Sequence, residues 1–594
     1  MKRIRSFALV GLLAAVVSVA GATTVHAADP VQAEVGGTGS ARDGQEATRF
    51  IVKRDATVSD ARFARSVRAA GLTLVRAQPS LRLAVVEGRI GTLELLRGLP
   101  GVLSVAQDYP VQPQSLGYDY TTQQGSLTNV TSWTGAKNLW KAGYTGDGID
   151  VALLDTGVAP VPALAASDKV VVGADLSFES QTAGARYLDS YGHGTVMGSI
   201  IAGRETAKSN GTTYANDQTH FYGLAPDARL VSVKLADRSG AVDVSQVIAG
   251  MDWVVANRYR VGNIRVINLS YGARSSLNAQ DDPLSWAAEA AWKSGIVVVA
   301  SSGNDGETSV GLASPAYNPW IIAVGATDNK GTSTAADDSV ASFSNTGNGL
   351  SRAPDLLAPG VGVIAPIPAG SQIAMSYPGA KIGNGYIRGS GTSQAAALVS
   401  GAVALTLSKY PDLKPDEVKR FLARSASTIP NVPSALQGKG SLQLNKVLSE
   451  APPLGYTTTA VTGNGTGALD KARGGNYVTI NGTPLRGEVD IMGQPWNSAT
   501  MAAAAANNTA WTADGYFNGV AWTGNGLVAD STSWAGRTWA GKSWQGRTWA
   551  SSNWLGRTWA TGTWSSSGWS SATWSGPVAK PNWSGASWSS ANWR

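Results

Sequence analysis

Apolar runs separated by helix-like stretches dominate the chain between about residue 146 and residue 450. The runs read IDVALLD, LVSVKL, VINLSYG, IVVVASSGN and IIAVGA, and amphipathic stretches such as DVSQVIAGMDWVVANR lie between them. Strands that are apolar on both faces and alternate with helices are typical of a parallel sheet covered on both sides. We therefore predict an α/β fold with a doubly wound parallel sheet, in a domain of roughly 300 residues.

Composition divides the rest of the chain into segments of different character. Residues 48–112 alternate strand-like and helix-like stretches in the order β-α-β-β-α-β, which is the split βαβ arrangement and predicts a small α+β domain. We expect these segments in order: a signal peptide (1–27), a linker (28–47), the α+β domain (48–112), a second linker (113–137), the sheet domain (138–450), a Gly/Ala-rich extension (451–530) and a Gly/Ser/Trp-rich repeat region that could be β-rich (531–594).

The first 27 residues have the layout of a signal peptide. Three basic residues precede an apolar run from Phe7 to Ala20, and small residues surround the end of the segment at Ala27. This run is shorter than the roughly 20 apolar residues of a membrane-spanning helix, so we predict export with cleavage after Ala27 and no transmembrane anchor. We expect a secreted, extracellular protein, with attachment to the cell wall as a further option.

The composition excludes cysteine-based sites, argues against nucleic-acid binding and limits which histidines can take part in catalysis. The chain has no cysteine, which excludes disulfides and thiolate chemistry and requires a large core. Its formal net charge of +7 is spread over 594 residues without a dense basic run, so we expect no nucleic-acid partner. Of the 3 histidines, His26 would leave with the signal peptide, so imidazole chemistry has to use His193 or His220.

Polar side chains follow three of the predicted strands. Asp155 ends IDVALLD, residues 270–272 end VINLSYG, and Asn304 ends IVVVASSGN. Because the carboxyl ends of parallel strands meet at one edge of a sheet, we expect these groups to lie close together. Two predicted helices begin beside them, at His193 in HGTVMGSIIAG and at Ser393 in SQAAALVSGAVALTLSKY.

These residue types fit nucleophilic catalysis. A serine hydroxyl is a weak nucleophile that needs an imidazole base, and a buried carboxylate orients that imidazole. We predict these roles for Ser393, His193 and Asp155, with Asn304 and the backbone N–H of Ser393 donating to an oxyanion. Asp189 is a second carboxylate near His193, and we prefer Asp155 because it ends a buried strand.

Four motifs in this order resemble the active-site motifs of the subtilisin-like serine peptidases, the S8 family of subtilases. They are VALLDTGV, YGHGTVMGSIIAG, SSGNDG and GSGTSQAAALVSGAVAL, in the chain order Asp, His, Asn, Ser. The resemblance covers about residues 138–447 and implies a secreted serine endopeptidase that hydrolyses peptide bonds through an acyl-enzyme. Gln394 and Ala397 replace the usual Met and Pro of the family, and we interpret both as tolerated substitutions.

The resemblance also implies how the enzyme binds its partners. The α+β domain resembles the subtilase propeptide, which assists folding, blocks the cleft and is removed by the enzyme itself. We expect that cut in QPQSLGYDYTTQQG, within the second linker. Protein or peptide substrates would pair with the chain as an added strand. The implied substrate-binding residues are Ser270, Tyr271, Gly272, Ser302 and Gly303.

No cofactor is required by this chemistry, although a structural calcium ion is an option. The stretches NDG and TDNKGTSTAADDSV carry carboxylates in loops. Hard cations need several converging oxygens, which a sequence does not show, so solvated loops are the alternative interpretation. The metal ligands stay unassigned.

The tail repeats tryptophan every five residues from Trp534 to Trp574. Three interpretations are open: a β-rich array that binds cell wall or polysaccharide, a self-packing stack, or a weakly ordered tail. Arg537, Arg547 and Arg557 recur every ten residues and could attract anionic wall polymers. The tail resembles the C-terminal regions of secreted actinobacterial subtilases. A second function is therefore a cell-envelope or polysaccharide-binding protein driven by these repeats, with an idle subtilase domain.

Overall fold

The computed structural model divides the chain into two compact units, residues 1–113 and residues 114–594. It describes residues 48–88, 92–107, 118–306, 311–347, 352–383, 385–480, 483–507, 509, 511–512, 516–517, 520–521 and 529–530. The expected signal peptide, the linker at 28–47 and the tryptophan repeats lie outside the described residues, as do residues 112–117 of the expected processing stretch.

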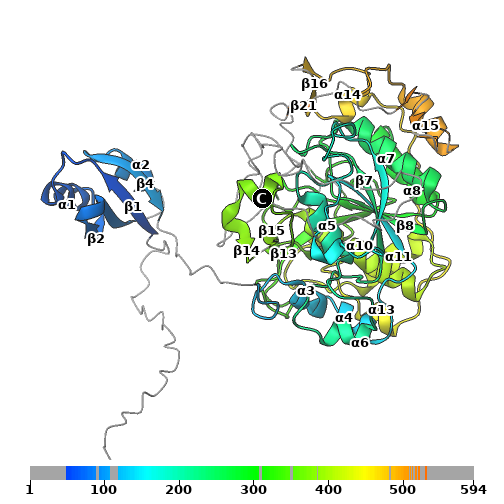
Figure 1. The fold of residues 1–594 in the computed structure, drawn as a ribbon, viewed down its shortest axis with the longest axis horizontal. Helices are drawn as coiled ribbons and strands as arrows, with labels where there is room; N and C mark the ends of the chain where they lie inside the picture. The colour runs from blue at the N-terminus through cyan, green and yellow to red at the C-terminus, as the bar shows by residue number, and fades with distance from the viewer. Residues whose placement is uncertain are drawn as a thin grey trace, which may run out of the picture. The chain divides into compact units, whose positions relative to one another are not determined.

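The first unit is a four-stranded antiparallel sheet with helices on one face (Figure 1, blue). Its strands lie in the order β2-β3-β1-β4, and Phe50, Val52, Phe63 and Val67 belong to a core of its own. In chain order its elements are β1 (Thr48–Arg54), α1 (Asp60–Ala69), β2 (Thr73–Gln78), the 3-10 turn η1 (Pro79–Leu81), β3 (Leu83–Gly88), α2 (Thr92–Arg97) and β4 (Val102–Gln107).

The second unit is built on an eight-stranded sheet in which all pairs are parallel except β10 with β11. The strand order is β11-β10-β9-β8-β5-β7-β6, and β12 also pairs with β10. The strands are β5 (Asp150–Asp155), β6 (Val170–Asp175), β7 (Arg229–Lys234), β8 (Ile264–Leu269), β9 (Val297–Ser301), β10 (Ile322–Asp328), β11 (Ser339–Val340) and β12 (Leu356–Pro359). Each apolar run that predicted a strand overlaps one of β5, β7, β8, β9 and β10.

Helices cover both faces of this sheet (Figure 1). The side chain of Leu153 lies against Gly198 of α5 (His193–Ala202), whereas that of Leu154 lies against Gly250 of α7 (Val244–Asn257). Since neighbouring residues of a strand face opposite ways, α5 and α7 lie on opposite faces. Helix α10 (Thr392–Lys409) packs beside α5, and α8 (Pro283–Lys293) packs beside α7. The predicted doubly wound parallel sheet is confirmed.

Shorter elements complete the second unit. Before the extension they are α3 (Leu127–Trp133), α4 (Ala136–Lys141), η2 (Pro162–Leu164), α6 (Gly211–Asn216), β13 (Val363–Pro366), α9 (Gln372–Ser376), η3 (Pro378–Ala380), β14 (Lys381–Ile382), β15 (Tyr386–Gly389), α11 (Pro415–Ser425), α12 (Ser434–Gln437) and α13 (Asn445–Ser449). None of the helices in the described residues has both the length and the apolar composition that crossing a membrane requires.

The described part of the C-terminal extension shares the core of the sheet domain. Leu469, Ile491, Trp496 and Met501 are buried in the same hydrophobic cluster as the central strands. The elements of the extension are α14 (Leu469–Ala472), β16 (Thr479–Ile480), β17 (Thr483–Pro484), α15 (Ser498–Ala506), β18 (Trp511–Thr512), β19 (Tyr516–Phe517), β20 (Val520–Ala521) and β21 (Ala529–Asp530).

Candidate active site

A carboxylate and an imidazole meet where β5 ends and α5 begins. Asp155 is the last residue of β5, His193 is the first residue of α5, and both side chains are fully buried. The Nδ1 atom of His193 lies 2.6 Å from Oδ1 of Asp155, which also accepts the backbone N–H of Thr156. Because a carboxylate accepts hydrogen bonds, this contact assigns the proton to Nδ1 and leaves the lone pair of a neutral ring on Nε2.

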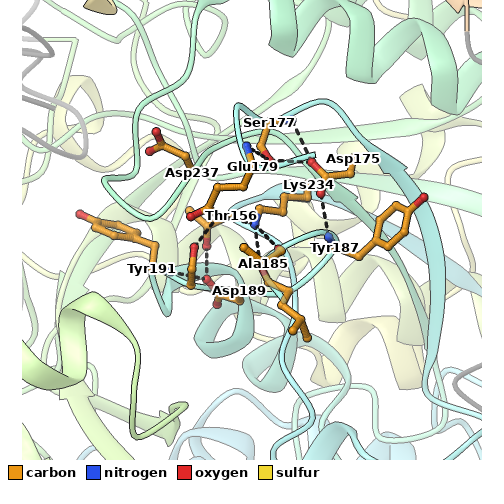
Figure 2. Close-up of polar contacts among 12 residues, drawn as sticks. Thr156, Asp175, Ser177, Glu179, Ala185, Tyr187, Asp189, Tyr191, Lys234 and Asp237 are labelled. Carbon is orange, nitrogen blue, oxygen red and sulfur yellow. Dashed lines mark hydrogen bonds and ion pairs between the residues drawn. The ribbon is translucent and has the colours of Figure 1, made fainter. Parts of the chain in front are cut away.

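The second carboxylate near His193 has a different task. Asp189 accepts the hydroxyl of Thr156 at 2.7 Å (Figure 2). It also accepts the backbone N–H groups of Gly192 and Thr195 at 2.6 and 2.7 Å. These contacts satisfy free N–H groups at the start of α5. Burial raises the pKa of Asp189, while the hydrogen bond from the Thr195 side chain opposes that shift. Asp189 therefore holds the helix start that carries His193.

The glycines on both sides of His193 are required by close approaches. Gly192 has a φ of 108°, and a Cβ there would lie 2.6 Å from the hydroxyl oxygen of Ser371. A Cβ on Gly194 would lie 2.0 Å from the carbonyl oxygen of Gly157, in the turn after β5. Any larger residue would push α5 away from β5. The pair of glycines thus sets the short distance between Asp155 and His193.

Ser393 is the second residue of α10, and its side chain is buried. A long helix directs the positive end of its dipole and its free N–H groups toward its own first turn. The hydroxyl of Ser270 donates to the backbone carbonyl of Ser393 at 3.4 Å and accepts from the Asn268 amide at 3.0 Å. The amide oxygen of Asn268 accepts the hydroxyl of Ser400, so the end of β8 is tied to two turns of α10.

Asn304 is fixed to the same helix start. Its amide oxygen accepts both the backbone N–H of Thr392, at 2.8 Å, and the hydroxyl of Thr392, at 2.9 Å. Because these contacts use the amide oxygen, they leave the NH₂ group of Asn304 for the predicted role of oxyanion donor. Gly303 has a φ of 108°, and a Cβ there would lie 2.6 Å from Nδ2 of Asn345.

The other predicted substrate-binding residues lie at the same edge in different settings. Tyr271 is buried and Gly272 is half-buried, directly after β8. Ser302 uses its backbone inside the protein: its N–H donates to Val324 at 2.8 Å and its carbonyl accepts from Ala313 at 2.9 Å. Because its backbone is bonded inside the protein, Ser302 is part of the structure that supports Asn304.

A buried charged cluster lies beside this site, and sequence reasoning did not identify it (Figure 2). Lys234 is the register partner of Asp155 on β7, and its ammonium group donates to Glu179, Ala185 and Leu188 at 2.6, 2.9 and 2.6 Å. Burial opposes its charge, but the nearby carboxylates, Glu179 first, raise the pKa of Lys234. Burial and then the charge of Glu179 raise the pKa of Asp237 to about 6. A lysine inside an otherwise apolar strand was the one available signal.

His220 lies apart from this chemistry. Its side chain is 48% exposed, and Nδ1 lies 2.7 Å from Oδ2 of Asp217. Hydrogen bonds from Tyr222 and Thr219, against the effect of partial burial, lower the pKa of Asp217. His220 is therefore a surface residue paired with a neighbouring acid.

Three of the four carboxylates in the stretches proposed for calcium have partners within the protein. Asp305 pairs with Arg274 at 2.8 Å, Asp328 pairs with Lys330 at 2.6 Å, and Asp337 accepts the hydroxyl of Thr332 at 2.8 Å. Within the described part of the chain, no three Asp, Glu, His or Cys side chains gather closely enough to hold a metal ion. Structural calcium remains a prediction without support from this geometry.

Comparison with known proteins places these residues in a family context. The model of the subtilase family matches residues 146–446, a range that contains Asp155, His193, Asn304 and Ser393. Serine protease AprX of Bacillus subtilis (strain 168) is 33% identical over 326 residues, which are 53% of this chain and 70% of AprX. Subtilisin DY of Bacillus licheniformis is 33% identical over 307 residues, which are 51% of this chain and 91% of that protein.

A solved structure is also similar. Fervidolysin from Fervidobacterium pennivorans, described as a keratinolytic enzyme related to subtilisin, aligns with a TM-score of 0.44 and 23% sequence identity. The alignment covers 70% of this chain and 63% of fervidolysin, slightly less than two thirds of its length.

Proposed function

This chain belongs to the subtilase family and is a serine endopeptidase, and from that premise we propose that Ser393, His193 and Asp155 carry out the hydrolysis. The observation that carries the proposal is the fully buried contact of 2.6 Å between His193 and Asp155. It lies at the same sheet edge as Asn304, whose amide is bonded to Thr392 at the start of the Ser393 helix. Substrates are proteins or peptides.

The reaction runs in two halves. The hydroxyl oxygen of Ser393 attacks the peptide carbonyl carbon while Nε2 of His193 takes its proton, and His193 then gives that proton to the leaving amine. Water attacks the resulting acyl-enzyme with His193 as base again, which releases the acid and restores Ser393. Asp155 stays ionised, holds the ring by Nδ1 and stabilises the imidazolium. These steps require no cofactor.

The developing oxyanion is stabilised by two donors, the side-chain NH₂ of Asn304 and the backbone N–H of Ser393. Thr392 holds the amide oxygen of Asn304, so the donor is oriented before the substrate arrives. In subtilisin itself, loss of one such donor costs roughly 10²- to 10³-fold in kcat, and we expect the same order here.

Substrate binding uses the segment that directly follows β8. The extended peptide pairs with residues 270–272 as an added strand, and Gly303 leaves room for the scissile bond. The proposal is supported by the position of Tyr271 and Gly272 at the carboxyl end of β8, two strands from β10 and directly beside β5. Ser302 contributes by supporting Asn304, because its own backbone is engaged by Val324 and Ala313.

The enzyme is exported and processes itself. Residues 1–27 serve as the signal peptide, and the unit at 48–112 acts as an inhibitory propeptide that is cut within 113–137. The proposal is supported by the separate core of the first unit and by its small four-stranded fold. A folding helper suits the second unit, because parallel sheets with distant strand pairing fold slowly.

Intact mass of the secreted protein, with and without a fluorophosphonate probe, tests the proposal. We expect the wild type to lose the residues up to the second linker and to take one label on Ser393. Ser393→Ala should keep the N-terminal unit and take no label. Equal masses and no label on either protein would contradict both catalysis and self-processing.

Binding of the cell wall or of polysaccharide by the tryptophan repeats is a separate matter. The repeats lie outside the described residues, so wall attachment remains a prediction. An envelope-binding protein with an idle subtilase domain is not favoured, because the contact between Asp155 and His193 and the anchoring of Asn304 are both intact.

A further inference from the structure

An arginine of the C-terminal extension forms a buried ion pair with the sheet domain. The guanidinium of Arg473 donates from Nε to Oδ1 of Asp243 at 2.7 Å and from Nη2 to Oδ2 at 3.3 Å, and both side chains are fully buried. Arg473 also donates to the backbone carbonyls of Gly487 and Val489, at 2.6 Å each. A planar fork with both partners desolvated fixes position and direction together.

Asp243 ends a loop whose first residue, Leu235, is hydrogen-bonded to the backbone of Asp155. The backbone N–H of Leu235 donates to the carbonyl of Asp155 at 2.7 Å, and the loop continues to Asp243 at the start of α7. The Gln246 amide donates to the carbonyl of Leu235 at 3.1 Å and accepts the N–H of Asp243 at 2.6 Å. The loop 235–243 is therefore held at one end by Asp155 and at the other by Arg473.

The same turn of the extension touches a second loop. The N–H of Ser276 donates to the carbonyl of Lys471 at 3.1 Å, and a Cβ on Gly474 would lie 1.8 Å from the carbonyl oxygen of Arg274. Arg274 in turn pairs with Asp305 at 2.8 Å, one residue after the proposed oxyanion donor. Only Ala273 separates Arg274 from Gly272, so the extension supports the loop that carries the proposed substrate-binding edge.

The two loops face the same part of the site. Burial first, and then charges that include Asp155 and Asp237, raise the pKa of Tyr271. Burial and charges that include Asp237 also raise the pKa of Tyr191, two residues before His193 (Figure 2). Asp237 of the first loop thus lies within electrostatic reach of both the substrate-binding edge and the start of α5.

We propose that Arg473 is a positioning residue, and that residues 469–489, here called the clamp segment, hold loops 235–243 and 270–276 in the geometry that binds substrate. The proposal rests on the proposed substrate-binding role of residues 270–272. It makes the extension a resident part of the catalytic unit. Processing that removes the tryptophan repeats therefore has to cut after residue 507, beyond the buried Met501 of α15.

The test compares full-length secreted variants. Arg473→Lys keeps the buried charge but loses the fork, and Arg473→Met removes the charge. Arg420→Met is the matched control, because Arg420 is exposed on α11, outside the clamp segment, and its guanidinium lies 5.2 Å from the centroid of the Tyr456 ring. Fluorophosphonate counts the active sites, and kcat and KM are measured per labelled site with an extended peptide substrate.

We expect Arg473→Lys to raise KM roughly 10-fold and to change kcat less than about 3-fold, because it weakens binding equally in ground and transition states. Arg420→Met should keep both constants at the wild-type values. Loss of folded enzyme lowers the number of labelled sites but leaves KM unchanged, so KM separates positioning from stability. If Arg473→Met is not secreted, the Lys variant decides the question.

Two results would overturn the proposal. One is an unchanged KM in Arg473→Lys, whatever the number of labelled sites, which would give the ion pair a purely structural role. The other is an active mature enzyme whose intact mass shows that it ends before Leu469. A wild-type enzyme that takes no label would instead contradict the proposed function, so the two failures are distinguishable.

Discussion

Two fully buried ion pairs of the sheet domain have nearly the same length and different tasks. Asp155 lies 2.6 Å from His193, and Asp243 lies 2.7 Å from Arg473. Both aspartates adjoin the loop 235–243, and in both pairs the partner comes from a distant part of the chain. Distance and burial alone therefore do not separate a catalytic pair from a supporting one.

The two pairs differ in how many oxygens of the aspartate accept hydrogen bonds, and in whether the partner side chain can change its charge. Asp243 uses both oxygens, because Arg473 takes both and the hydroxyl of Ser245 also donates to Oδ2. Oδ2 of Asp155 has no hydrogen-bond partner among the described residues. Histidine changes charge near neutral pH, whereas arginine stays charged. In the described part of the chain, the aspartate of the catalytic pair therefore has one oxygen without a hydrogen bond, whereas the aspartate that holds the loop accepts hydrogen bonds at both oxygens.

Neutralising each aspartate in turn should affect catalysis very differently in the two pairs. Asp155→Asn should slow catalysis about 10⁴-fold, because an amide does not hold the required imidazole tautomer or stabilise the imidazolium. Asp243→Asn should leave the chemical step within about threefold of the wild type. The rate at which the purified precursor loses its N-terminal unit measures both variants in one assay. Equal rates for the two variants would remove the distinction.

Removing one or both members of the supporting pair should have opposite consequences for stability. Arg473→Met leaves Asp243 as an uncompensated buried charge and should lower the free energy of unfolding by about 3–5 kcal/mol. The double variant Arg473→Met/Asp243→Leu should recover most of that loss, apart from about 1 kcal/mol for the lost cap of α7. Urea unfolding of the fluorophosphonate-inactivated enzyme measures both. Additive losses would show that the pair carries no buried-charge penalty.

The sequence could predict the sheet and its edge because periodicity and strand ends are local signals. The run IDVALLD indicates a buried strand, and parallel strands bring their carboxyl ends together, so Asp155 was expected beside the groups that follow β8 and β9. The glycines around His193 take part in close approaches inside the protein, to Ser371 and to the carbonyl of Gly157, which the motif alone does not indicate.

The clamp segment could not be predicted, because its contacts are non-local. Arg473 lies in a Gly-rich stretch without periodicity, and its partner Asp243 is 230 residues away. Nothing in the sequence near Ser302 shows that its backbone bonds to Val324 and Ala313. Such contacts depend on how separate segments pack, which a local pattern does not encode.

A third buried pair, Glu179 with Asp237, sharpens the comparison because its members carry like charges. The pKa of Asp237 is raised from 3.8 to about 6 by burial and by Glu179, so the native state binds this proton more tightly than the unfolded state. The stabilising contribution is therefore complete below about pH 4 and is lost as the pH rises through about 6. Asp237→Asn should stabilise the enzyme by about 1–3 kcal/mol above pH 6 and have little effect below pH 4.

Urea unfolding of the inactivated enzyme between pH 4 and pH 8 measures this difference, with Asp217→Asn as the control of opposite sign. The pKa of Asp217 is lowered by hydrogen bonds despite partial burial, so its contribution is present above its ordinary pKa and is lost only in acid. The control should therefore differ from the wild type by a constant amount between pH 5 and pH 8. A constant difference for Asp237→Asn as well would mean that Lys234, which donates to Glu179, already neutralises the whole cluster.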